Sequence, residues 1–500
     1  MKSYDLAIIG AGPAGYAAAM RAMDFGLKTV LINKGRLGGA GIFDGALSSK
    51  TLWELSENYL TTRSSNFAYR VFDSELEYQD VISEVNKAVT VRHQQLYQQI
   101  DFYRKKGILR YIKGWAKLSD KNTIEVETGD YEIETIKAKD IILAIGTKPR
   151  KIASIPIDEE NILTSDGISN LKNFPASMVI LGAGVIGCEF ATIFSNFGKT
   201  RVHLIDKEER ILPFEDEDLS NTVAKNLEDN GCHVHRNSRL LSMKLNEDKH
   251  VVYELEYKDG TKEIHTVEKA LVAVGRSSQP QGMGLEKIGI ELTDRNQCVD
   301  NDTCTTVDNI YAVGDFTADI SLVNIGVQEG RYCVEKICEY DDPSQLSYDN
   351  ISWIMFLNPE VAAVGKNEKQ CRKEGIPYRV AKMSFTFLNR AIAMRRTQGF
   401  FKLIVTDDDE MRILGTRVLG NHASSTIESV ALMIKLGKGI RELSNIMTPH
   451  PSIPEGLQEC VRMLLGSPML KPQIFTQHLQ CYRVSGEGEV ERMKHGNGSF

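Results

Sequence analysis

Hydrophobic residues near the N-terminus form a short run that ends in closely spaced glycines. Residues 6–9 read LAII, and Gly10, Gly12 and Gly15 follow directly. The next segment, residues 14–26, is rich in alanine, and a second apolar run, KTVLIN, comes after it. Apolar strand, small-residue helix and apolar strand in this order predict a βαβ unit of about thirty residues.

Glycines at this spacing are typical of a nucleotide-binding turn. They permit the tight turn, let backbone N–H groups approach a pyrophosphate, and let the helix pack closely on the strand. The helix N-terminus also presents a partial positive charge to an anion. The pattern therefore predicts a dinucleotide site, although Asn33 closes the second strand, where an acidic residue usually binds a ribose hydroxyl.

The same order of elements recurs in the middle of the chain, in SMVILGAGVIGCEFATIFSNFGKTRVHLID. Its glycines at this spacing are Gly182, Gly184 and Gly187. Here the second strand closes on Asp206, whose carboxylate can accept from an adenosine ribose and repels a 2′-phosphate. Asp206 therefore favours NAD over NADP, and the nearby Lys207 and Arg210 weaken that preference.

Another segment, residues 76–108, has apolar residues at helical spacing and contains no glycine before Gly107. This spacing predicts one long amphipathic helix. We interpret its apolar residues as part of a hydrophobic core and not as a groove for a partner.

Length and composition indicate a multidomain globular protein. The 500 residues are too many for one hydrophobic core and predict about three domains. A content of 42% hydrophobic and 25% charged residues is ordinary for a soluble protein, and no apolar run is long enough for a membrane helix. The net charge of -7 argues against nucleic acid and anionic lipid as partners. The nine cysteines include no CxxC pair, and the N-terminus lacks the basic region of a signal peptide, so we expect a cytoplasmic protein.

A third segment, NIYAVGDFT, reads as a short strand, residues 310–313, that ends in Gly314 and Asp315. With both glycine motifs, this segment makes the chain resemble the FAD-dependent pyridine nucleotide-disulfide oxidoreductases, and among them the dihydrolipoamide dehydrogenase-like branch. The likeness extends through IILAIGTKP, LVAVGR, NPEVAAVG, LNRA and RILGTRVLG, and so covers about residues 3–465.

The resemblance implies an α/β fold with two Rossmann-like dinucleotide-binding domains, one for FAD and one for NAD, and a C-terminal α+β dimerisation domain. The FAD-binding domain would comprise residues 1–148 and 276–346, with the long amphipathic helix packed against it. Residues 149–275 would bind NAD, and residues 347–470 would be the dimerisation domain through which two chains form a homodimer. Residues 471–500 would be a C-terminal tail, partly flexible.

The resemblance also assigns cofactor contacts. Those implied for FAD are Gly10, Gly12, Gly15, Asn33, Gly39, Lys50, Gly146, Gly314 and Asp315. Those implied for NAD(H) are Gly182, Gly184, Gly187, Asp206 and Gly275. No metal ion is expected.

The loop RLGGAGIFDGALSSK, residues 36–50, departs from the family at the two positions that carry its chemistry. Disulfide-reducing members have a cysteine pair where this chain has Gly41 and Ala46. Neither residue can accept electrons, so we expect no reduction of lipoamide or glutathione. The surrounding residues still fit the pattern, which indicates a loop kept for the flavin; they are Gly38, Gly39, Gly45, Ser49 and Lys50.

Two further pairs of residues follow from the resemblance. Lys50 would lie beside flavin N5 and pair with Glu189. A cation near N5 favours the anionic reduced flavin. The alternative is that Lys50 and Glu189 form an ordinary ion pair between domains. His450, oriented by Glu455, would reach the flavin site of the other subunit and transfer a proton. Without a thiol to protonate, this pair either serves another acceptor or is a structural remnant of the interface.

Other clusters are weaker candidates. CHVHR, with Cys232, His233 and His235, could suggest a metal site, and the period of two would put both histidines on one strand face. We interpret it as an ordinary strand, because no second group of ligands stands near it in the sequence. Cys460 could act as a substitute thiol, and Cys481 in the tail as a redox shuttle, but a buried apolar role is favoured for Cys460.

These observations predict a FAD-dependent NADH oxidoreductase that passes hydride from NADH to FAD and then reduces a small, non-disulfide acceptor, such as a quinone-like compound or a dye, in a diaphorase-type reaction. Small residues at positions 41 and 46 could leave room for a flat acceptor over the flavin. Two alternatives remain. The chain could be a soluble pyridine nucleotide transhydrogenase, although the expected selectivity of Asp206 and the presence of His450 argue against it. It could also be a non-catalytic flavin-bound scaffold or sensor.

Overall fold

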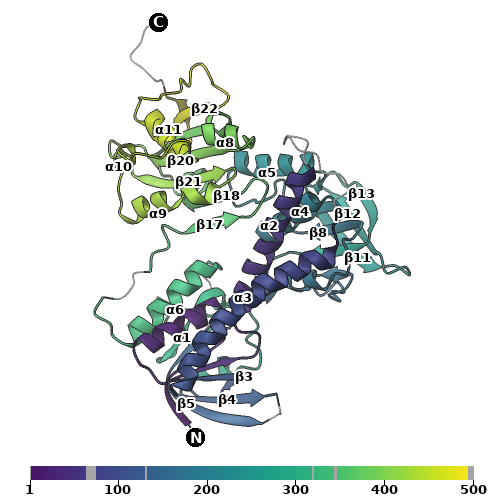
Figure 1. Cartoon of the computed structure of the whole chain (residues 1–500), viewed down its shortest axis with the longest axis vertical. Helices are drawn as coiled ribbons and strands as arrows, with labels where there is room; N and C mark the ends of the chain where they lie inside the picture. The colour runs from purple at the N-terminus through teal and green to yellow at the C-terminus, as the bar shows by residue number, and fades with distance from the viewer. Residues whose placement is uncertain (1, 64–74, 130–131, 318–319, 343–345, 494–500) are drawn as a thin grey trace. The chain divides into compact units, whose positions relative to one another are not determined.

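The computed structural model describes residues 2–63, 75–129, 132–317, 320–342 and 346–493 (Figure 1). The chain forms two compact units, each built from separate stretches of sequence. The first unit consists of residues 1–54, 76–173 and 272–346. The second consists of residues 55–75, 174–271 and 347–500. The second glycine motif and the C-terminal region thus share one unit, and the finer three-domain boundaries stay a prediction.

The first unit is built on a six-stranded sheet. Its strands are β1 (Lys2–Ile9), β2 (Thr29–Asn33), β3 (Leu109–Leu118), β4 (Thr123–Thr128), β5 (Ile133–Leu143) and β16 (Ile310–Ala312). β1 pairs in parallel with both β2 and β5, and β16 pairs in parallel with β5. The near-continuous apolar sequences of β1 and β2 are typical of strands that are buried on both faces.

Two helices of this unit pack on each other. α1 (Pro13–Asp24) and α6 (Val323–Ile337) lie side by side (Figure 1). A Cβ at Gly330 of α6 would collide with the carbonyl oxygen of Ala14, so glycine permits the close approach. The predicted long helix is confirmed as α3 (Tyr78–Lys105), which contacts β3 and buries one apolar face.

Residues 149–173, expected in the NAD-binding domain, belong to the first unit. The short strands β6 (Lys148–Pro149) and β15 (Arg276–Ser277) pair with each other. The hydroxyl of Tyr78 on α3 donates to the carbonyl of Ile168 at 2.8 Å. These contacts attach the segment to the first unit, and they join residues too far apart in sequence for a local pattern to reveal.

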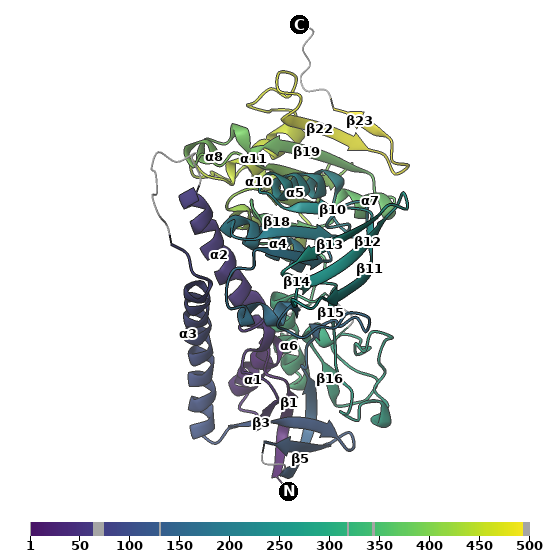
Figure 2. The same cartoon turned by 90° about the vertical axis from the view of Figure 1, so that its right-hand side faces the viewer.

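The second unit contains a mainly parallel sheet and a small antiparallel one. β8 (Ser177–Leu181), α4 (Val185–Phe197) and β9 (Arg201–Ile205) form the second predicted βαβ unit. β10 (His233–His235) extends this sheet beside β9, and β14 (Lys269–Val272) lies beside β8. The antiparallel sheet consists of β11 (Ser238–Leu245), β12 (Val251–Tyr257) and β13 (Lys262–Val267), and α5 (Glu217–Asp229) packs on β10 (Figure 2).

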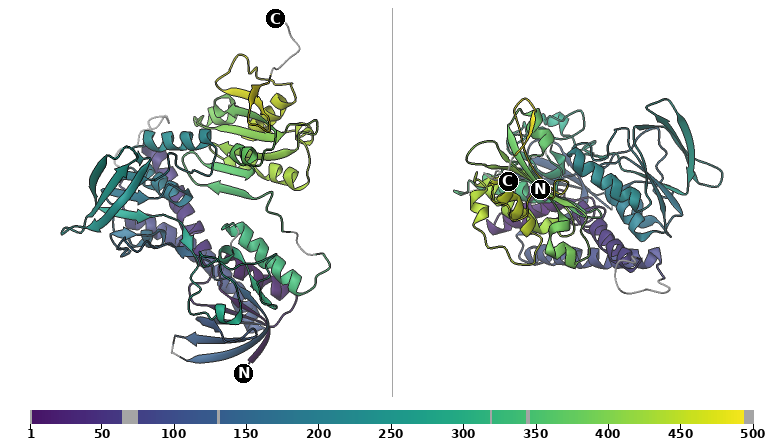
Figure 3. Two further views of the ribbon diagram at one scale, coloured as in Figure 1. Left: turned by 180° about the vertical axis from the view of Figure 1, so that it is seen from behind. Right: turned by 90° about the horizontal axis from the view of Figure 1, so that it is seen from above.

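The C-terminal part of the second unit is a seven-stranded sheet, green to yellow in Figure 3. In sheet order it runs β17 (Ser352–Met355), β18 (Val361–Gly365), β21 (Ile413–Leu419), β20 (Phe400–Thr406), β19 (Tyr378–Ser384), β22 (Leu479–Val484) and β23 (Val490–Arg492). Its helices are α7 (Glu368–Lys373), α8 (Asn389–Ala393), α9 (Glu428–Lys435), α10 (Arg441–Ser444) and α11 (Glu455–Leu464). α11 packs on β19 and β20.

The expectation of a separate tail from residue 471 is wrong for much of that segment. β22 pairs with β19, and β23 pairs with β22, so both strands extend the sheet. Leu479, Cys481 and Val484 are buried, and their burial holds β22 in place. Residues 494–500 of the expected tail lie outside the described residues. Among the described residues, no helix combines the length and hydrophobicity needed to span a membrane.

Candidate functional site

The first glycine turn has the geometry of a pyrophosphate cradle. Gly10 has a φ of 105°, which favours glycine, and a Cβ there would collide with the carbonyl of Ala144. A Cβ at Gly15 would collide with the carbonyl of Gly10. A Cβ at Gly12, the residue before the first turn of α1, would meet nothing within 4 Å. The backbone is therefore packed on one side and open at the helix N-terminus, and helix N-termini are suited to bind anions.

Asn33 holds this turn through both ends of its amide. Its Oδ1 accepts from the backbone N–H of Ala11 at 3.2 Å, and its Nδ2 donates to the carbonyl of Gly35 at 3.1 Å. The residue is 9% exposed. Asn33 thus ties the end of β2 to the glycine turn, as an acidic residue at this position would also do.

Loops that follow three neighbouring parallel strands meet at this turn. Gly146 and Thr147 follow β5, and Asp315 follows β16. The hydroxyl of Thr147 donates to Oδ2 of Asp315 at 3.1 Å, and Nε of Arg276 donates to that hydroxyl at 3.0 Å. Parallel sheets bind ligands at the carboxyl ends of their strands. The predicted FAD residues of β1, β5 and β16 therefore come together, and Thr147 and Arg276 join them although sequence reasoning missed both.

The loop before α2 packs against the first glycine turn. The N–H of Gly38 donates to the carbonyl of Ala11 at 2.8 Å, and a Cβ at Gly39 would lie 3.1 Å from the Cα of Gly12. A Cβ at Gly41 would collide with the ring of Pro13. Pro13 therefore fills the space into which a side chain at position 41 would point, and the expected room over the flavin at positions 41 and 46 stays a prediction.

α2 (Ala46–Arg63) begins at Ala46, the second of the two positions at which disulfide-reducing members of the family have a cysteine. Nζ of Lys50, on its second turn, lies 3.4 Å from Oγ of Ser49, whose hydroxyl donates to the carbonyl of Gly45 at 2.5 Å. Glu189 lies on α4 in the other unit, is 5% exposed, and accepts from the backbone N–H of Phe356 at 3.0 Å. The pairing of Lys50 with Glu189 stays a prediction.

The second glycine turn repeats the geometry of the first. Gly182 has a φ of 102°, a Cβ at Gly187 would collide with the carbonyl of Gly182, and a Cβ at Gly184 would meet nothing within 4 Å. Asp206 accepts through Oδ2 from the N–H of Ala183 at 2.7 Å and through Oδ1 from the N–H of Glu208 at 2.9 Å. Gly275, also expected to bind NAD, lies in the first unit.

His450 and Glu455 form the predicted pair. Nδ1 of His450 lies 2.7 Å from Oε1 of Glu455, and Oε2 of Glu455 accepts from the N–H of Ser452 at 2.8 Å. The histidine side chain is 62% exposed in the single chain. The carboxylate therefore fixes the orientation of the ring and leaves Nε2 facing outward.

Family comparisons agree with these two glycine turns and with the C-terminal sheet. Residues 4–330 match the family model described as pyridine nucleotide-disulphide oxidoreductase, and residues 351–461 match the dimerisation domain of that family. The chain belongs to the pyridine nucleotide-disulphide oxidoreductase family. Members of this family are FAD- and NAD(P)-dependent oxidoreductases, and the open glycine cradles fit both cofactors.

Relatives place this oxidoreductase in the dihydrolipoamide dehydrogenase-like branch. Dihydrolipoyl dehydrogenase 3 from Pseudomonas putida is 30% identical over 94% of this chain and 100% of its own length. Dihydrolipoyl dehydrogenase from Geobacillus stearothermophilus is 32% identical over 92% of this chain and 96% of its own.

Solved structures show the same fold. The HOCl-induced flavoprotein disulfide reductase RclA from Escherichia coli superposes with a TM-score of 0.81 at 25% identity, over 92% of this chain and 100% of that chain. LpdA from Mycobacterium tuberculosis superposes with a TM-score of 0.84 at 24% identity, over 93% of this chain and 100% of that chain.

The thiols of this pyridine nucleotide-disulphide oxidoreductase are all free. Cys460 on α11 is fully buried, and burial raises the pKa of its thiol well above the usual value. Burial also raises the pKa of Cys481 to about 12, and its Sγ lies 3.5 Å from Sδ of Met493. Both thiols are therefore held in the unreactive protonated form, and neither has the exposure that a redox shuttle needs.

Proposed function

We propose that this family member oxidises NADH through bound FAD and passes the electrons directly to a small acceptor that is not a disulfide. The observation that carries the proposal is the sequence of the loop beside the first glycine turn. Gly41 and Ala46 stand where the resemblance places the redox cysteines, and the first cysteine of the chain is Cys188. Without a thiol on this loop, electrons have no internal dithiol through which to pass.

Bound FAD would accept the hydride of NADH and deliver two electrons to the acceptor; the residues of the chain bind, orient and protonate. Gly12 and Gly184 would leave the backbone open to the two pyrophosphates. Asp206 would accept from the ribose of NADH and repel the extra phosphate of NADPH. Lys50, with Glu189 as its expected partner, would place positive charge beside the flavin.

His450 would supply a proton to the acceptor. Oε1 of Glu455 holds Nδ1 of the ring, so Nε2 is the atom that would exchange the proton. A quinone-like acceptor takes up two electrons and two protons, and NADH supplies only one hydrogen nucleus. The second proton would come from solvent through His450 of a partner subunit in a homodimer, which the matching dimerisation domain supports.

Free cysteines along the whole chain support a reducing compartment, and we place the enzyme in the cytoplasm.

The substrate class follows from the loop of residues 36–50, because only an acceptor that reacts with flavin itself can replace the disulfide. A flat quinone-like compound or a dye would meet that requirement.

The decisive experiment is an anaerobic titration of the purified flavoprotein with NADH, followed by flavin absorbance. We expect complete reduction after one equivalent of NADH per flavin, without a thiolate–flavin charge-transfer band. A requirement for two equivalents would reveal a redox-active disulfide and contradict the proposal. Equal rates of reduction by NADH and NADPH would instead favour a transhydrogenase, and slow or absent reduction would favour a scaffold or sensor.

A further inference from the structure

Four of the chain's ten histidines gather in the second unit; we call His203, His233, His235 and His265 the histidine cluster. His203 lies on β9, in register with His233 of the neighbouring strand β10. The His203 ring stacks on those of His233 and His235, with centroids 5.2 Å and 5.4 Å apart. The ring of His265, on β13, lies 5.3 Å from that of His235.

The interpretation of CHVHR as a strand without further ligands is therefore corrected in part. Both histidines of that strand do contact the same ring, as the period of two predicted. Cys232 is buried and takes no part in the group of ligand atoms, but Glu263 and His265 do. These two residues come from β13, about thirty residues further along the chain, which is why no local pattern revealed them.

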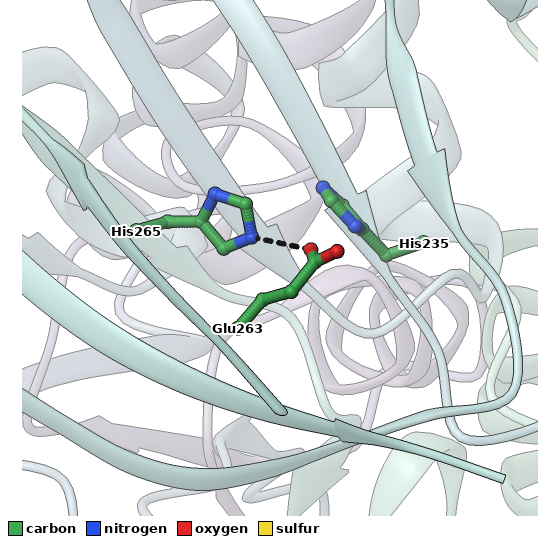
Figure 4. A group of neighbouring side chains, drawn as sticks. All are labelled: His235, Glu263 and His265. Carbon is green, nitrogen blue, oxygen red and sulfur yellow. Dashed lines mark hydrogen bonds and ion pairs between the residues drawn. The ribbon is translucent and has the colours of Figure 1, made fainter. Parts of the chain in front are cut away.

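The side chains of His235 and His265, from the histidine cluster, converge with that of Glu263. Figure 4 shows the rings of His265 and His235 on either side of the Glu263 carboxylate. Nε2 of His265 lies 2.9 Å from Oε2 of Glu263, and one ligand atom from each of the three residues lies within 4.8 Å of the others. A tetrahedral Zn²⁺ with bonds of 2.0–2.1 Å needs ligand atoms about 3.3 Å apart. Small rotations of these side chains would reach that spacing.

The remaining contacts orient the rings. Nε2 of His235 lies 3.1 Å from Nδ1 of His203, and Nδ1 of His235 lies 2.7 Å from the hydroxyl of Tyr257. That hydroxyl also donates to Oε2 of Glu263 at 2.8 Å. A metal-binding histidine usually has its second ring nitrogen hydrogen-bonded, which fixes its orientation and tautomer. His203 meets this requirement for His235.

We propose that His235, Glu263 and His265 bind one divalent transition-metal ion of the Zn²⁺ class. Two imidazoles and one carboxylate are a donor set that Zn²⁺ accepts, and they leave a fourth position for water. On binding, the nitrogen of His265 that faces Glu263 and Nδ1 of His235 both present a lone pair, so the proton of each moves to the other nitrogen of the same ring. The protonated Nε2 of His235 then donates to Nδ1 of His203, and the ion takes the place of the Tyr257 hydroxyl at Nδ1. No electrons are transferred, and the proposal stands apart from the flavin chemistry above.

A bound ion would join two sheets. His235 belongs to the sheet of β8 and β9, whereas Glu263 and His265 belong to the small antiparallel sheet. The carbonyl of His235 also accepts from the backbone N–H of Asp206 at 3.1 Å. The ion would therefore stabilise the strand end that carries Asp206, and it would raise the melting temperature of the protein by mass action.

The test uses the full-length flavin-loaded protein after treatment with a chelator and its removal. Isothermal titration with Zn²⁺ should give one site per chain with micromolar or tighter affinity, and a melting temperature that rises by a few degrees. Co²⁺ should give the visible absorption of a four-coordinate ion. The double variant E263Q/H265Q should bind about 100-fold more weakly or not at all, because two of three ligands are gone.

The matched control is His250→Gln. His250 is an exposed histidine in the turn before β12 of the same region, and it lies outside the cluster. This variant should bind Zn²⁺ as the unaltered protein does. Flavin content and circular dichroism check that each variant is folded.

Two results would overturn the proposal. One is the absence of Zn²⁺ binding by the unaltered protein at micromolar concentrations. The side chains would then only form hydrogen bonds with one another. The other is an unchanged isotherm for E263Q/H265Q, which would place the ion elsewhere. An anomalous difference map of Zn²⁺-soaked crystals at the zinc absorption edge locates the ion even if the double variant does not fold.

Discussion

The carboxylate of Asp206 accepts a hydrogen bond of 2.7 Å from the backbone N–H of Ala183, which ties the end of β9 to the second glycine turn. Asn33 makes the corresponding bond to the N–H of Ala11 at 3.2 Å in the first turn. An amide can therefore hold such a turn as a carboxylate does. The two turns differ at this position in charge, and charge is what distinguishes NADH from NADPH.

Replacing Asp206 with asparagine should leave the fold intact and weaken the preference for NADH. Because the repulsion of the 2′-phosphate is removed, we expect the ratio of kcat/KM for NADPH to that for NADH to rise about tenfold, equivalent to about 1.4 kcal/mol. Steady-state kinetics with a dye acceptor measure both values. The matched control, Asn33→Asp in the other turn, should leave the ratio unchanged. An unaltered ratio in Asp206→Asn would contradict the assigned role.

His450→Gln should separate proton transfer from electron transfer. General acid catalysis contributes about 100-fold or more, so turnover with a quinone-like acceptor should fall by at least about tenfold. Reduction of the flavin by NADH and turnover with ferricyanide, which takes up electrons only, should stay within about twofold of the unaltered enzyme.

The exposed position of His450 makes this variant a fair test, since its ring is 62% exposed and contributes little to folding of the single chain. Glu455→Gln is the companion variant and should show a smaller loss, because His450 itself remains and only its hydrogen-bond partner changes. If every acceptor is turned over at the original rate, His450 has no proton-transfer role.

Placing cysteines at positions 41 and 46 should not create a disulfide reductase. In Gly41→Cys the new Cβ would collide with the ring of Pro13, whereas position 46 is the first residue of α2 and already carries a Cβ. We therefore expect Gly41→Cys to lower the melting temperature by several degrees through overpacking of about 1–3 kcal/mol, and Ala46→Cys to change it little. The double variant should show no lipoamide reduction. Lipoamide turnover by the double variant would show that the loop adapts and that only two side chains separate it from its relatives.

Local patterns were sufficient to predict the parts of the fold that local sequence determines. The glycine spacing placed both βαβ units, and the helical period of residues 76–108 placed α3. The same patterns did not predict that residues 149–173 attach to the first unit, because that attachment depends on Tyr78 and the pairing of β6 with β15.

The candidate site shows the same limit. His450 and Glu455 are five residues apart, and the resemblance to the family implied their pairing. The meeting of His235 with His265, and of Thr147 with Arg276, joins separate strands. Such pairs depend on tertiary packing, which no window of sequence contains.

A buried lysine holds the second unit together. Nζ of Lys402, on β20, lies 3.1 Å from Asp216, 2.6 Å from Asp218 and 2.8 Å from Glu368, and the side chain is 1% exposed. Burial alone would lower the pKa of this lysine, but the nearby carboxylates of Asp218, Glu368 and Asp216 raise it. Lys402 therefore stays charged, and it compensates carboxylates from two regions of the chain, the start of α5 and α7.

Lys402→Met should lower the free energy of unfolding by about 3–5 kcal/mol, because it leaves buried carboxylates without their counter-charge. Lys382 offers the matched control: it lies 2.7 Å from Asp218 alone and is 20% exposed, so Lys382→Met should cost about 1 kcal/mol or less. Urea unfolding of both variants, followed by tryptophan fluorescence, measures the difference.

The pKa of Asp218 is lowered: burial alone would raise it, but Lys402 and Lys382 outweigh that effect. The stabilisation by Lys402 is therefore present at neutral pH and is lost as the pH falls through that depressed pKa, so the gap between Lys402→Met and the unaltered protein should narrow in acid. A gap that is small at neutral pH, or that widens in acid, would show that the three carboxylates find other partners.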